Sequence, residues 1–512
     1  MFNLAMVLTE SAARHPERPA VLDDGRAWTF SELDRRADAF ADSLQSDGIR
    51  PGDAVGLQMA NGAAFVIAYY GILRAGSVVV PVNPLAVSRE ISHIMKSAEL
   101  RSMVTESENL ETVLRADPQG RLPTMFVAGP ADPPTRRIRS FDEASAKPAS
   151  SEHRLPVMRP LDSTAAIIFT SGTTGAPKAA ELTHGNLLSS CTHVTRDADV
   201  READVTLACI PLFHVFGMTG LMNTSVAQGL PLVTLRRFSP DDVFRLIEEH
   251  SVTRTSFVPT MIAELISADP PDRDLSSLRR ITSGGAPLDV QHVAGTEELF
   301  PAATLLEGYG ASETTSSICV NRDRGTRRLG SVGTATWGTQ IRVVDDDGRA
   351  VPKGASDIGE VQVRGLTVFS GYRGDPEATA AAFDGDWLRT GDLGHVDSDG
   401  YLFLSGRRSE LIIRGGYNVY PAEVEVVLTS HPSVAEAAVI GVPDVRLGQE
   451  IVAFIVTSAQ VEAQELDAFA RERLSRYKCP REIRFVDDLP KTASGKIRRA
   501  VLSRDGNTSS EV

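Results

Sequence analysis

The sequence predicts an α/β fold in which a large N-terminal domain is followed by a small α+β C-terminal domain. The chain of 512 residues is too long for one hydrophobic core, so two or more domains are expected. Segments with helical spacing of apolar residues alternate with short apolar stretches that are typical of buried strands. After about residue 330, apolar and polar residues alternate between glycine turns, which favours antiparallel strands.

The first part of the chain predicts two helices and three strands. The helices cover residues 5–14 and 31–46, where apolar residues recur at helical spacing. The strands are "DAVGLQM", "SVVVPV" and "RSMVTE", three short apolar runs between polar segments. Residues 129–160 are rich in Pro, Ala, Ser and charge without periodicity, so we expect a connection that crosses the surface.

The middle of the chain continues the α/β pattern. Helices are predicted at 240–250 and 260–268. The predicted buried strands between and around them are "STAAIIFT", "VTLACIP", "LPLVTL", "RTSFVP" and "LRRITSGG". The alternating stretches 330–351 and 359–365 then predict a β-rich piece that closes the large lobe.

Residues 411–512 predict a compact second domain of about 100 residues, which is a usual domain size. The expected order is a strand, a helix at 421–432, strands at 434–443 and 450–457, a helix at 463–477 and a polar tail.

Composition narrows the functional classes. The net charge is −14 and no long basic run occurs, which disfavours nucleic acid or an anionic membrane as the main partner. The four cysteines are scattered without C-x-x-C spacing, so neither a disulfide framework nor a zinc site is expected. The N-terminal residues do not resemble a signal peptide, and the most apolar window, 63–82, contains Arg74 and two glycines. We therefore expect a soluble cytoplasmic protein without an integral membrane segment that acts on small molecules.

The stretch "FTSGTTGAPK", residues 169–178, has the composition of a phosphate-binding loop. Glycines allow backbone N–H groups to approach phosphate oxygens, hydroxyls add donors and a lysine adds countercharge. The residues concerned are Thr170, Ser171, Gly172, Thr173, Thr174, Gly175 and Lys178. Pro177 and Ala179 break the pattern of the common NTPase P-loop. Taken alone, the stretch is equally explained as a surface loop rich in glycine and threonine.

Three further stretches carry groups suited to a nucleotide. "LLEGYGASETT" (305–315) joins an aromatic ring, glycines, a hydroxyl and a carboxylate, which could stack on a purine, bind phosphate and ligate Mg²⁺. "DWLRTGDLGHVDSDGYLFLSGR" (386–407) places an aspartate in a glycine turn, and "LPKTASGKIRR" (489–499) places a lysine in a Gly/Ser loop. Singly, they read as glycine turns with solvated acids and a basic tail; their joint occurrence favours a nucleotide site.

In this order, the motifs resemble those of the adenylate-forming superfamily, which includes acyl-CoA synthetases, firefly luciferase and the adenylation domains of peptide synthetases. The resemblance covers nearly the whole chain. The matching motifs are "TSGTTGAPK", "PLFHVFG", "SGGAPL", "GYGASET", "TGD", "GRRSELIIRGGYNVYPAEVE", "GVPD" and "PKTASGKIRR". The resemblance implies an AMP-binding domain at 1–407, built of α/β layers and a β-barrel, and a mobile C-terminal domain at 408–512.

The resemblance also implies the chemistry. An acid carboxylate attacks the α-phosphate of ATP, pyrophosphate leaves, and the thiol of coenzyme A then attacks the acyl-adenylate. Lys496, Glu313 and His214 are the implied catalytic residues, with Glu313 as the Mg²⁺ ligand. The other implied roles are binding of the β- and γ-phosphates by the loop from Ser171 to Lys178, adenine contact by Tyr309 and the backbone of Gly285, Ala286 and Pro287, and ribose contact by Asp392 and Arg407. Thr170, Gly310 and Ser312 complete the expected cofactor-binding set.

In the family, the thiol step follows rotation of the small domain. Gly415 and Gly416 are then expected along the pantetheine channel, although a plain turn explains them equally well. The hinge position, usually aspartate or lysine, is Ser409 here, so the balance between the two conformations is expected to differ. Ser312 replaces a commoner threonine and keeps the hydroxyl group.

The acid is less well defined. Phe213, His214 and Phe216 lie where the family binds the acyl group, with His193 and Met218 as neighbours, although core packing explains most of them equally well. We expect a hydrophobic acid: medium- or long-chain fatty, aryl or polycyclic.

Several alternatives stay open. The acceptor is CoA or a carrier protein, and the chain is compatible with a monomer or a homodimer. The rival functions are an enzyme that performs mainly one half-reaction, a luciferase-like oxidative enzyme, and a non-catalytic nucleotide-binding module.

Overall fold

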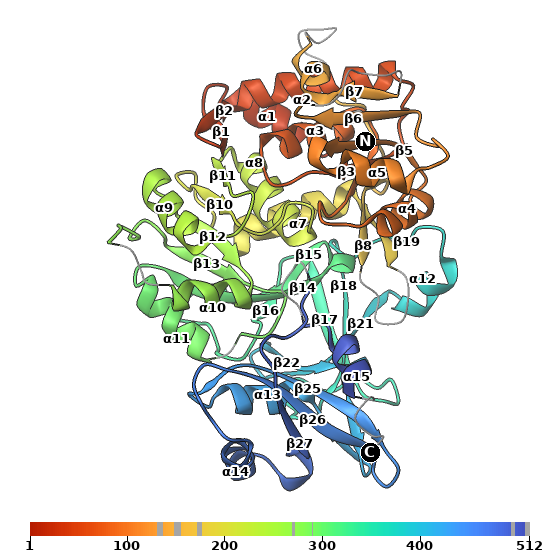
Figure 1. Ribbon diagram of the computed structural model, residues 1–512. Helices are drawn as coiled ribbons and strands as arrows, with labels where there is room; N and C mark the ends of the chain where they lie inside the picture. Colours follow the sequence, from red (N-terminus) through yellow and green to blue (C-terminus); the bar gives the residue numbers. More distant parts are fainter. Residues whose placement is uncertain are drawn as a thin grey trace.

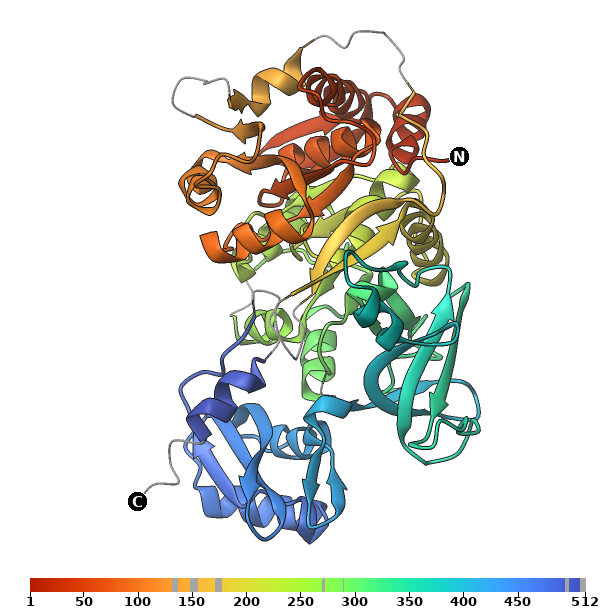
Figure 2. The ribbon, with the colours of Figure 1, turned by 90° about the vertical axis from the view of Figure 1, so that its right-hand side faces the viewer.

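The structure is a computed structural model that describes residues 1–130, 137–147, 155–170, 177–268, 272–288, 290–492 and 497–506. The described strands form four sheets. Figure 1 shows the first sheet in the upper part of the molecule, the second and third sheets in the middle and the fourth, C-terminal sheet at its lower end. The 90° view in Figure 2 separates the C-terminal part in the same way.

The first sheet has eight strands in the order β19-β9-β8-β4-β3-β5-β6-β7. Its centre is parallel, and β8, β9 and β19 add antiparallel pairs at one edge. The strands are β3 (Ala54–Gln58), β4 (Val78–Pro81), β5 (Leu100–Glu106), β6 (Thr124–Ala128), β7 (Ile138–Ser140), β8 (Thr164–Thr170), β9 (Lys178–Thr183) and β19 (Gly371–Tyr372). Because β19 pairs with β9, Gly371 and Tyr372 lie beside Glu181 and Ala180, nearly 200 residues earlier in the chain.

The second sheet has nine strands in the order β16-β15-β14-β13-β12-β10-β11-β1-β2. The strands from β1 to β14 in this order are parallel. The bounds are β1 (Pro19–Asp23), β2 (Arg26–Thr29), β10 (Thr206–Ala208), β11 (Leu232–Thr234), β12 (Arg254–Phe257), β13 (Arg280–Ser283), β14 (Thr304–Ala311), β15 (Ser316–Val320) and β16 (Thr334–Ala335). The carboxyl ends of β13 and β14 therefore meet at one edge, where ligands commonly bind in α/β proteins.

The third sheet is antiparallel, as the alternating pattern predicted. It contains β17 (Thr339–Val344), β18 (Gly359–Gly365), β20 (Phe383–Asp384), β21 (Trp387–Val396) and β22 (Leu402–Arg407). The chain then passes through one short 3₁₀ turn, η4 (Arg408–Glu410), into the fourth sheet. That sheet contains β23 (Ile412–Arg414), β24 (Tyr417–Val419), β25 (Val434–Asp444), β26 (Gly448–Thr457) and β27 (Glu482–Phe485).

The predicted helices are confirmed, with ends that differ from the predicted ones by a few residues. Residues Thr29 and Glu32 form a reciprocal capping box at the start of α2, which explains its firm N-terminus. The larger helices are α1 (Met6–Arg14), α2 (Phe30–Ser46), α3 (Ala63–Arg74), α4 (Ser88–Ser97), α7 (His184–Asp197), α9 (Pro240–His250), α10 (Pro259–Ser267), α11 (Val290–Leu299), α13 (Pro421–Thr429), α14 (Ala463–Arg473) and α15 (Arg499–Gly506). The shorter ones are α5 (Leu110–Ala116), α6 (Phe141–Ala146), α8 (Thr224–Gln228) and α12 (Pro376–Ala382). The α/β prediction is therefore confirmed.

The most apolar window folds into the core as α3 and β4. Every residue of α3 except Ala64 is buried, including Arg74, whose guanidinium pairs with Asp34 and lies 3.3 Å from Asp38 on α2. Burial of this arginine is tolerated because two carboxylates compensate its charge. In the described ranges no helix combines the length and apolarity that crossing a membrane would require.

One prediction on the fold was wrong. Residues 129–160 are not only a surface connection, because they contain β7, paired with β6, and α6. The cause is Phe141, which is 1% exposed and packs edge-on against Phe40 with ring centroids 4.9 Å apart. A single buried aromatic residue fixes this segment, and one anchor does not produce a detectable periodicity.

Candidate active site

Asp392 and Arg407 form the polar centre of the candidate site. They stand opposite each other in the antiparallel pairing of β21 with β22, and Arg407 Nε lies 3.1 Å from Asp392 Oδ1. The hydroxyl of Tyr309 donates a hydrogen bond to the other oxygen, Asp392 Oδ2. Asp392 raises the pKa of the Arg407 guanidinium, and burial, with Asp392 as the next cause, raises the pKa of Tyr309. Both groups therefore keep their protons and face Asp392 as donors.

The sequence around Tyr309 explains how it reaches Asp392. At Tyr309 and Gly310 the pairing of β14 with β15 contains a bulge. A Cβ on Gly310 would lie 1.5 Å from the carbonyl oxygen of Ser316, so only glycine fits there. Tyr309 lies at this bulge, and its hydroxyl reaches Asp392 on β21.

Glu313 forms a second cluster with two other side chains. Its Oε1 atom accepts a hydrogen bond of 2.9 Å from the hydroxyl of Tyr372, and Lys178 Nζ lies 5.0 Å from the centroid of the Tyr372 ring. Lys178 and Glu313 were predicted from sequence, whereas Tyr372 was missed. The only signal for it was a Gly-Tyr pair in "FSGYRGDPEAT", which reads as an ordinary strand end.

The turn that presents Glu313 is strained. It is a 3₁₀ turn, η3 (Ser312–Thr314), followed by Thr315 at φ +53° and Ser316 at φ +96°. Thr315 is fixed from two sides: its hydroxyl donates to the Thr367 carbonyl at 2.7 Å, and its own carbonyl accepts from Ser190 at 2.9 Å. Left-handed backbone at non-glycine residues persists only where the surroundings enforce it, and such sites cluster at functional positions.

The phosphate-loop prediction lies partly outside the described residues, because Ser171, Gly172, Thr173, Thr174 and Gly175 fall in the gap 171–176. The flanking residues are described: Thr170 ends β8 and Lys178 begins β9, and the two pair directly in the β8–β9 ladder. The residues on either side of the gap, Thr170 and Lys178, are therefore neighbours in the sheet, and Lys178 lies next to Tyr372. Lys496 also lies outside the described residues, in the gap 493–496.

The segment predicted to flank adenine lies beside the Tyr309 strand. β13 pairs with β14 up to Ser283 and Glu307, and a Cβ on Gly284 would lie 3.1 Å from the carbonyl oxygen of Gly308. Gly285 has φ +91°, and the following backbone is exposed through Ala286 and Pro287. The structure thus brings this exposed segment and Tyr309 to adjoining strand ends.

The predicted acyl region contains a π-helix, η2 (Phe216–Asn223), a form frequent at functional sites. Just before it, His214 Nδ1 accepts a 3.3 Å hydrogen bond from the Phe216 N–H. The Phe216 ring lies against the backbone at Gly284, where an added Cβ would be 3.6 Å from its Cε1 atom. Met218 and His193 are 0% and 1% exposed, so they pack in the core, which was the alternative explanation for both.

Gly415 and Gly416 form the turn between β23 and β24. Their φ angles are +58° and +83°, and the Gly415 N–H donates to the Leu447 carbonyl at 2.7 Å. The turn by itself therefore accounts for both glycines in this conformation, and their contact with pantetheine stays a prediction. Ser409, the predicted hinge, lies in η4 between the third and fourth sheets.

Glu307 is a second residue that sequence reasoning did not single out. It lies on β14 two residues before Tyr309, and burial raises its pKa to about 7 against the opposing effect of Arg327. No sequence pattern reveals this shift, because it depends on residues distant in the chain.

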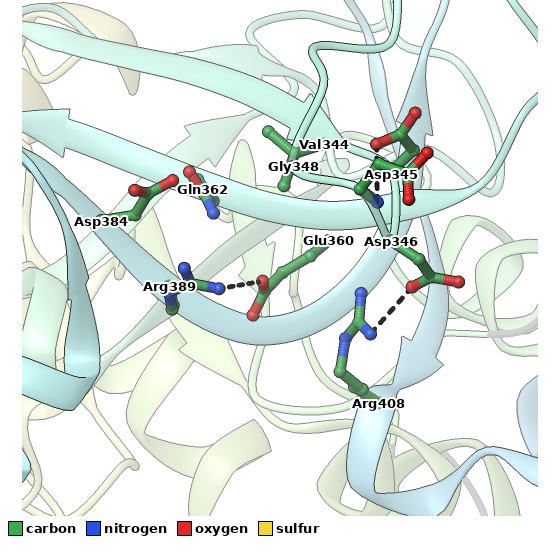
Figure 3. A pocket seen from close by; sticks show the side chains of 10 residues that line it. Val344, Asp345, Asp346, Gly348, Glu360, Gln362, Asp384, Arg389 and Arg408 are labelled. Atoms are coloured by element: carbon green, nitrogen blue, oxygen red, sulfur yellow. Dashed lines mark hydrogen bonds and ion pairs between the residues drawn. The ribbon is translucent and has the colours of Figure 1, made fainter.

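A cavity of about 370 Å³ lies apart from these groups, between the β17–β18 turn, β21 and the start of η4 (Figure 3). Arg408 lies 2.9 Å from Asp346 across it, and Arg389 lies 3.3 Å from Glu360. Five carboxylates and two guanidinium groups line this cavity, so its excess negative charge is unsuited to a nucleotide. It does show that Arg408 joins the segment before Ser409 to the third sheet.

Comparisons with known proteins agree with this geometry. The model of the AMP-binding enzyme family matches residues 8–373, and that of the AMP-binding enzyme C-terminal domain matches residues 423–496. The chain belongs to this family of adenylate-forming enzymes, as the motifs indicated. It is an acid–thiol ligase, and ATP, Mg²⁺ and coenzyme A, the predicted cofactors, are those of this enzyme class.

Individual relatives cover the chain almost end to end. The long-chain-fatty-acid–CoA ligase of Bacillus subtilis is 33% identical over 98% of this chain and 94% of that protein. The 2-succinylbenzoate–CoA ligase of Bacillus pumilus is 34% identical over 96% of each chain. The crystal structure of ATP-bound MatB from Rhodopseudomonas palustris superposes with a TM-score of 0.90, at 30% identity over 98% of this chain and 99% of that one.

Proposed function

We propose that this enzyme activates a hydrophobic carboxylic acid with ATP and transfers the acyl group to coenzyme A. The observation that carries the proposal is Asp392, held between Tyr309 and Arg407 beside the Glu313 cluster. Asp392 Oδ2 accepts a hydrogen bond from Tyr309 and Oδ1 forms an ion pair with Arg407; a carboxylate has acceptor sites beyond these two, which could accept both ribose hydroxyls.

In the first half-reaction, a carboxylate oxygen of the acid attacks the α-phosphorus of ATP and the bond to pyrophosphate breaks. Two anions must meet: at about 4 Å, unit charges repel by roughly 4 kcal/mol at an effective dielectric constant near 20. Lys178, Lys496 and Mg²⁺ would supply the compensating charge, with the loop from Thr170 to Lys178 around the β- and γ-phosphates. Preorganised charge of this kind stabilises a transition state.

The residues present fit a magnesium ion that is bound jointly with the nucleotide. Glu313 Oε1 is taken by Tyr372, whereas Oε2 has no protein partner within the described part of the chain. That part also contains no cluster of three or more His, Cys, Asp or Glu side chains able to hold a metal. Mg²⁺ typically uses one or two carboxylates plus substrate phosphates, which is what a single Glu313 provides.

In the second half-reaction, the thiol of CoA attacks the acyl carbonyl and AMP leaves. We propose that residues 408–512 form a mobile domain that rotates about Ser409 and brings Gly415 and Gly416 to the pantetheine. The abrupt change of sheet between Arg407 and Ile412 supports this boundary. A carrier-protein thiol is the alternative acceptor.

We propose a hydrophobic substrate, a fatty, aryl or polycyclic acid, because Phe213, His214 and Phe216 precede or begin the π-helix beside Gly284. Enzymes named for a long-chain fatty acid and for succinylbenzoate are similarly distant from this chain. We also propose that the enzyme acts in the cytoplasm.

A panel of carboxylic acids with ATP, Mg²⁺ and CoA tests the proposal, with pyrophosphate and thioester followed together. The proposal predicts equal amounts of both for at least one hydrophobic acid. Nucleotide binding without turnover of any acid would support a non-catalytic module instead, and pyrophosphate without thioester would indicate another acceptor.

A further inference from the structure

We propose that Tyr372 is a positioning residue that holds Glu313 in the orientation required for magnesium and holds the Lys178 ammonium group over its ring. This inference rests on the proposed function and deepens it. Tyr372 lies between the two charged groups: its hydroxyl is 2.9 Å from Glu313 Oε1, and its ring centroid is 5.0 Å from Lys178 Nζ. One side chain therefore contacts the carboxylate assigned to the metal and the cation assigned to phosphate.

The backbone around Tyr372 is fixed by two contacts and by the glycine that precedes it. Its N–H donates to Thr379 Oγ1 at 2.9 Å, and Tyr372 pairs with Ala180 in the β19–β9 ladder. Gly371 has φ +141°, and a Cβ there would lie 2.7 Å from Thr379 Cγ2, so glycine is required before the tyrosine. A side chain held by such a backbone can orient its neighbours.

The same segment also holds Glu313 directly. The N–H of Phe369 donates to the Glu313 carbonyl at 2.8 Å, and the rings of Phe369 and Tyr372 pack edge-on with centroids 4.9 Å apart. Residues 369–372 therefore fix both the backbone and the side chain of Glu313. They place these groups next to Lys178, the first residue of β9.

Packing alone does not explain the hydroxyl. The ring packs against Phe369, a contact that phenylalanine would make equally well. The hydroxyl instead donates a hydrogen bond to Oε1 of Glu313. This hydrogen bond fixes the orientation of the carboxylate and leaves Oε2 for the metal.

Nucleotide binding without chemistry tests the proposal. The probe is a non-hydrolysable ATP analogue, titrated by calorimetry into the full chain in Mg²⁺ and in EDTA. Tyr372→Phe removes the hydrogen bond and keeps the ring under Lys178; Tyr372→Leu removes both. Tyr401→Phe is a matched control, because it also removes one tyrosine hydroxyl, which donates to the Thr326 carbonyl. Tyr401 directly precedes β22, whose other end carries Arg407.

We expect Tyr372→Phe to weaken analogue binding about tenfold in Mg²⁺ and not at all in EDTA, because the lost hydrogen bond acts through Glu313 and the metal. Tyr372→Leu should also weaken binding about threefold in EDTA, because Lys178 loses its aromatic contact. In a Glu313→Gln background, Tyr372→Phe should have no further effect. Tyr401→Phe should bind as the native chain does.

Equal loss for Tyr372→Phe with and without Mg²⁺, or no loss in either, would overturn the positioning role. Failure of the native chain to bind the analogue at all would instead contradict the proposed function. The two failures are thus distinguishable.

Discussion

Arg407 stands directly opposite Asp392 in the β21–β22 pairing, with Nε 3.1 Å from Oδ1. The register of two antiparallel strands therefore places the arginine beside the aspartate of the candidate ribose site. Tyr309, from a different sheet, contacts the other oxygen of Asp392. Because backbone hydrogen bonding fixes this pair, its contribution to the binding of the nucleotide should be the same in the ground state and in the transition state.

Asp392→Ala should accordingly raise the KM for ATP about tenfold to a hundredfold with a smaller change in kcat, since uniform binding acts mainly through KM. Steady-state kinetics with ATP as the varied substrate measure this. Asp399→Asn is the control, because the Asp399 side chain, which is 62% exposed, pairs with Arg328 in the turn between the same strands. An unchanged KM in Asp392→Ala would contradict the ribose role.

Lys496→Ala should reduce adenylation by about 10² to 10³, which corresponds to roughly 3 to 4 kcal/mol of lost transition-state stabilisation. Thioester formation from a supplied acyl-adenylate should be spared, because the lysine is assigned to the first step alone. Lys353→Ala, which removes an exposed lysine, is the control. Equal losses of rate in both half-reactions would contradict the assignment of Lys496 to adenylation alone.

Glu410→Gln should weaken adenylation selectively, by about threefold to tenfold. Arg499 follows Lys496 by three residues; its Nη2 atom lies 2.7 Å from Glu425 and its Nη1 atom 3.2 Å from Glu410, the residue after Ser409. Arg499 thus joins the lysine loop to the linker. In a Lys496→Ala background the Glu410 effect should vanish. Glu423→Gln, which breaks the pair with Lys478 in the same domain, is the control.

Ser409→Asp should change the ratio of the two half-reaction rates, because a bias of about 1.4 kcal/mol alters a conformer ratio tenfold. A charged side chain can make contacts that serine is too short to reach. Ser409→Pro should slow the overall reaction by restricting the hinge. Each half-reaction is timed separately in single-turnover experiments. If aspartate changes neither rate and proline impairs neither, position 409 is not the hinge.

The stability of the fold should fall on acidification between about pH 6.5 and pH 4. Burial lowers the pKa of His184 and of His193 to about 4, so in this range the unfolded chain binds more protons than the folded one. Each histidine should cost about 1.4 kcal/mol per pH unit, with full stability above pH 6.5. Glu307 has the opposite effect on stability. Burial raises its pKa from 4.5 to about 7, so its contribution to the free energy of unfolding is full below about pH 4.5 and is lost as the pH rises to about 7.

The shift of the urea midpoint with pH measures this. His193→Gln should lower the slope by about 1.4 kcal/mol per pH unit, because it removes one of the two neutral buried histidines. A slope that His193→Gln does not alter would contradict the assignment of His193 as a neutral buried group.

Sequence predicted the elements whose signal is local. The helices at 31–46 and 240–250 have long apolar stripes and good caps, and the structure confirms them. The short α6 depends on a single buried aromatic residue and was missed. The π-helix after His214 was also missed, because a π form has no period that separates it from an α-helix in eight residues.

Some residues of the candidate site could likewise be predicted from the sequence, and others could not. Residues in glycine-rich motifs, such as Asp392 and Glu313, are visible because the backbone there requires unusual residues. Tyr372 and Glu307 are not visible, since their environment depends on pairing between segments far apart in the chain: β19 with β9 and β14 with β13. The strain at Thr315 and Ser316 likewise arises from tertiary contacts that no local pattern encodes.

The fate of the carboxylate oxygen tests the central claim most directly. With the acid that the substrate panel identifies, labelled with ¹⁸O in both carboxylate oxygens, attack on the α-phosphorus transfers one labelled oxygen to the nucleotide when CoA displaces it. Mass spectrometry should therefore find one ¹⁸O in AMP for each thioester formed, and none in pyrophosphate. Label in inorganic phosphate together with ADP, or thioester formation with unlabelled AMP, would contradict an acyl-adenylate intermediate.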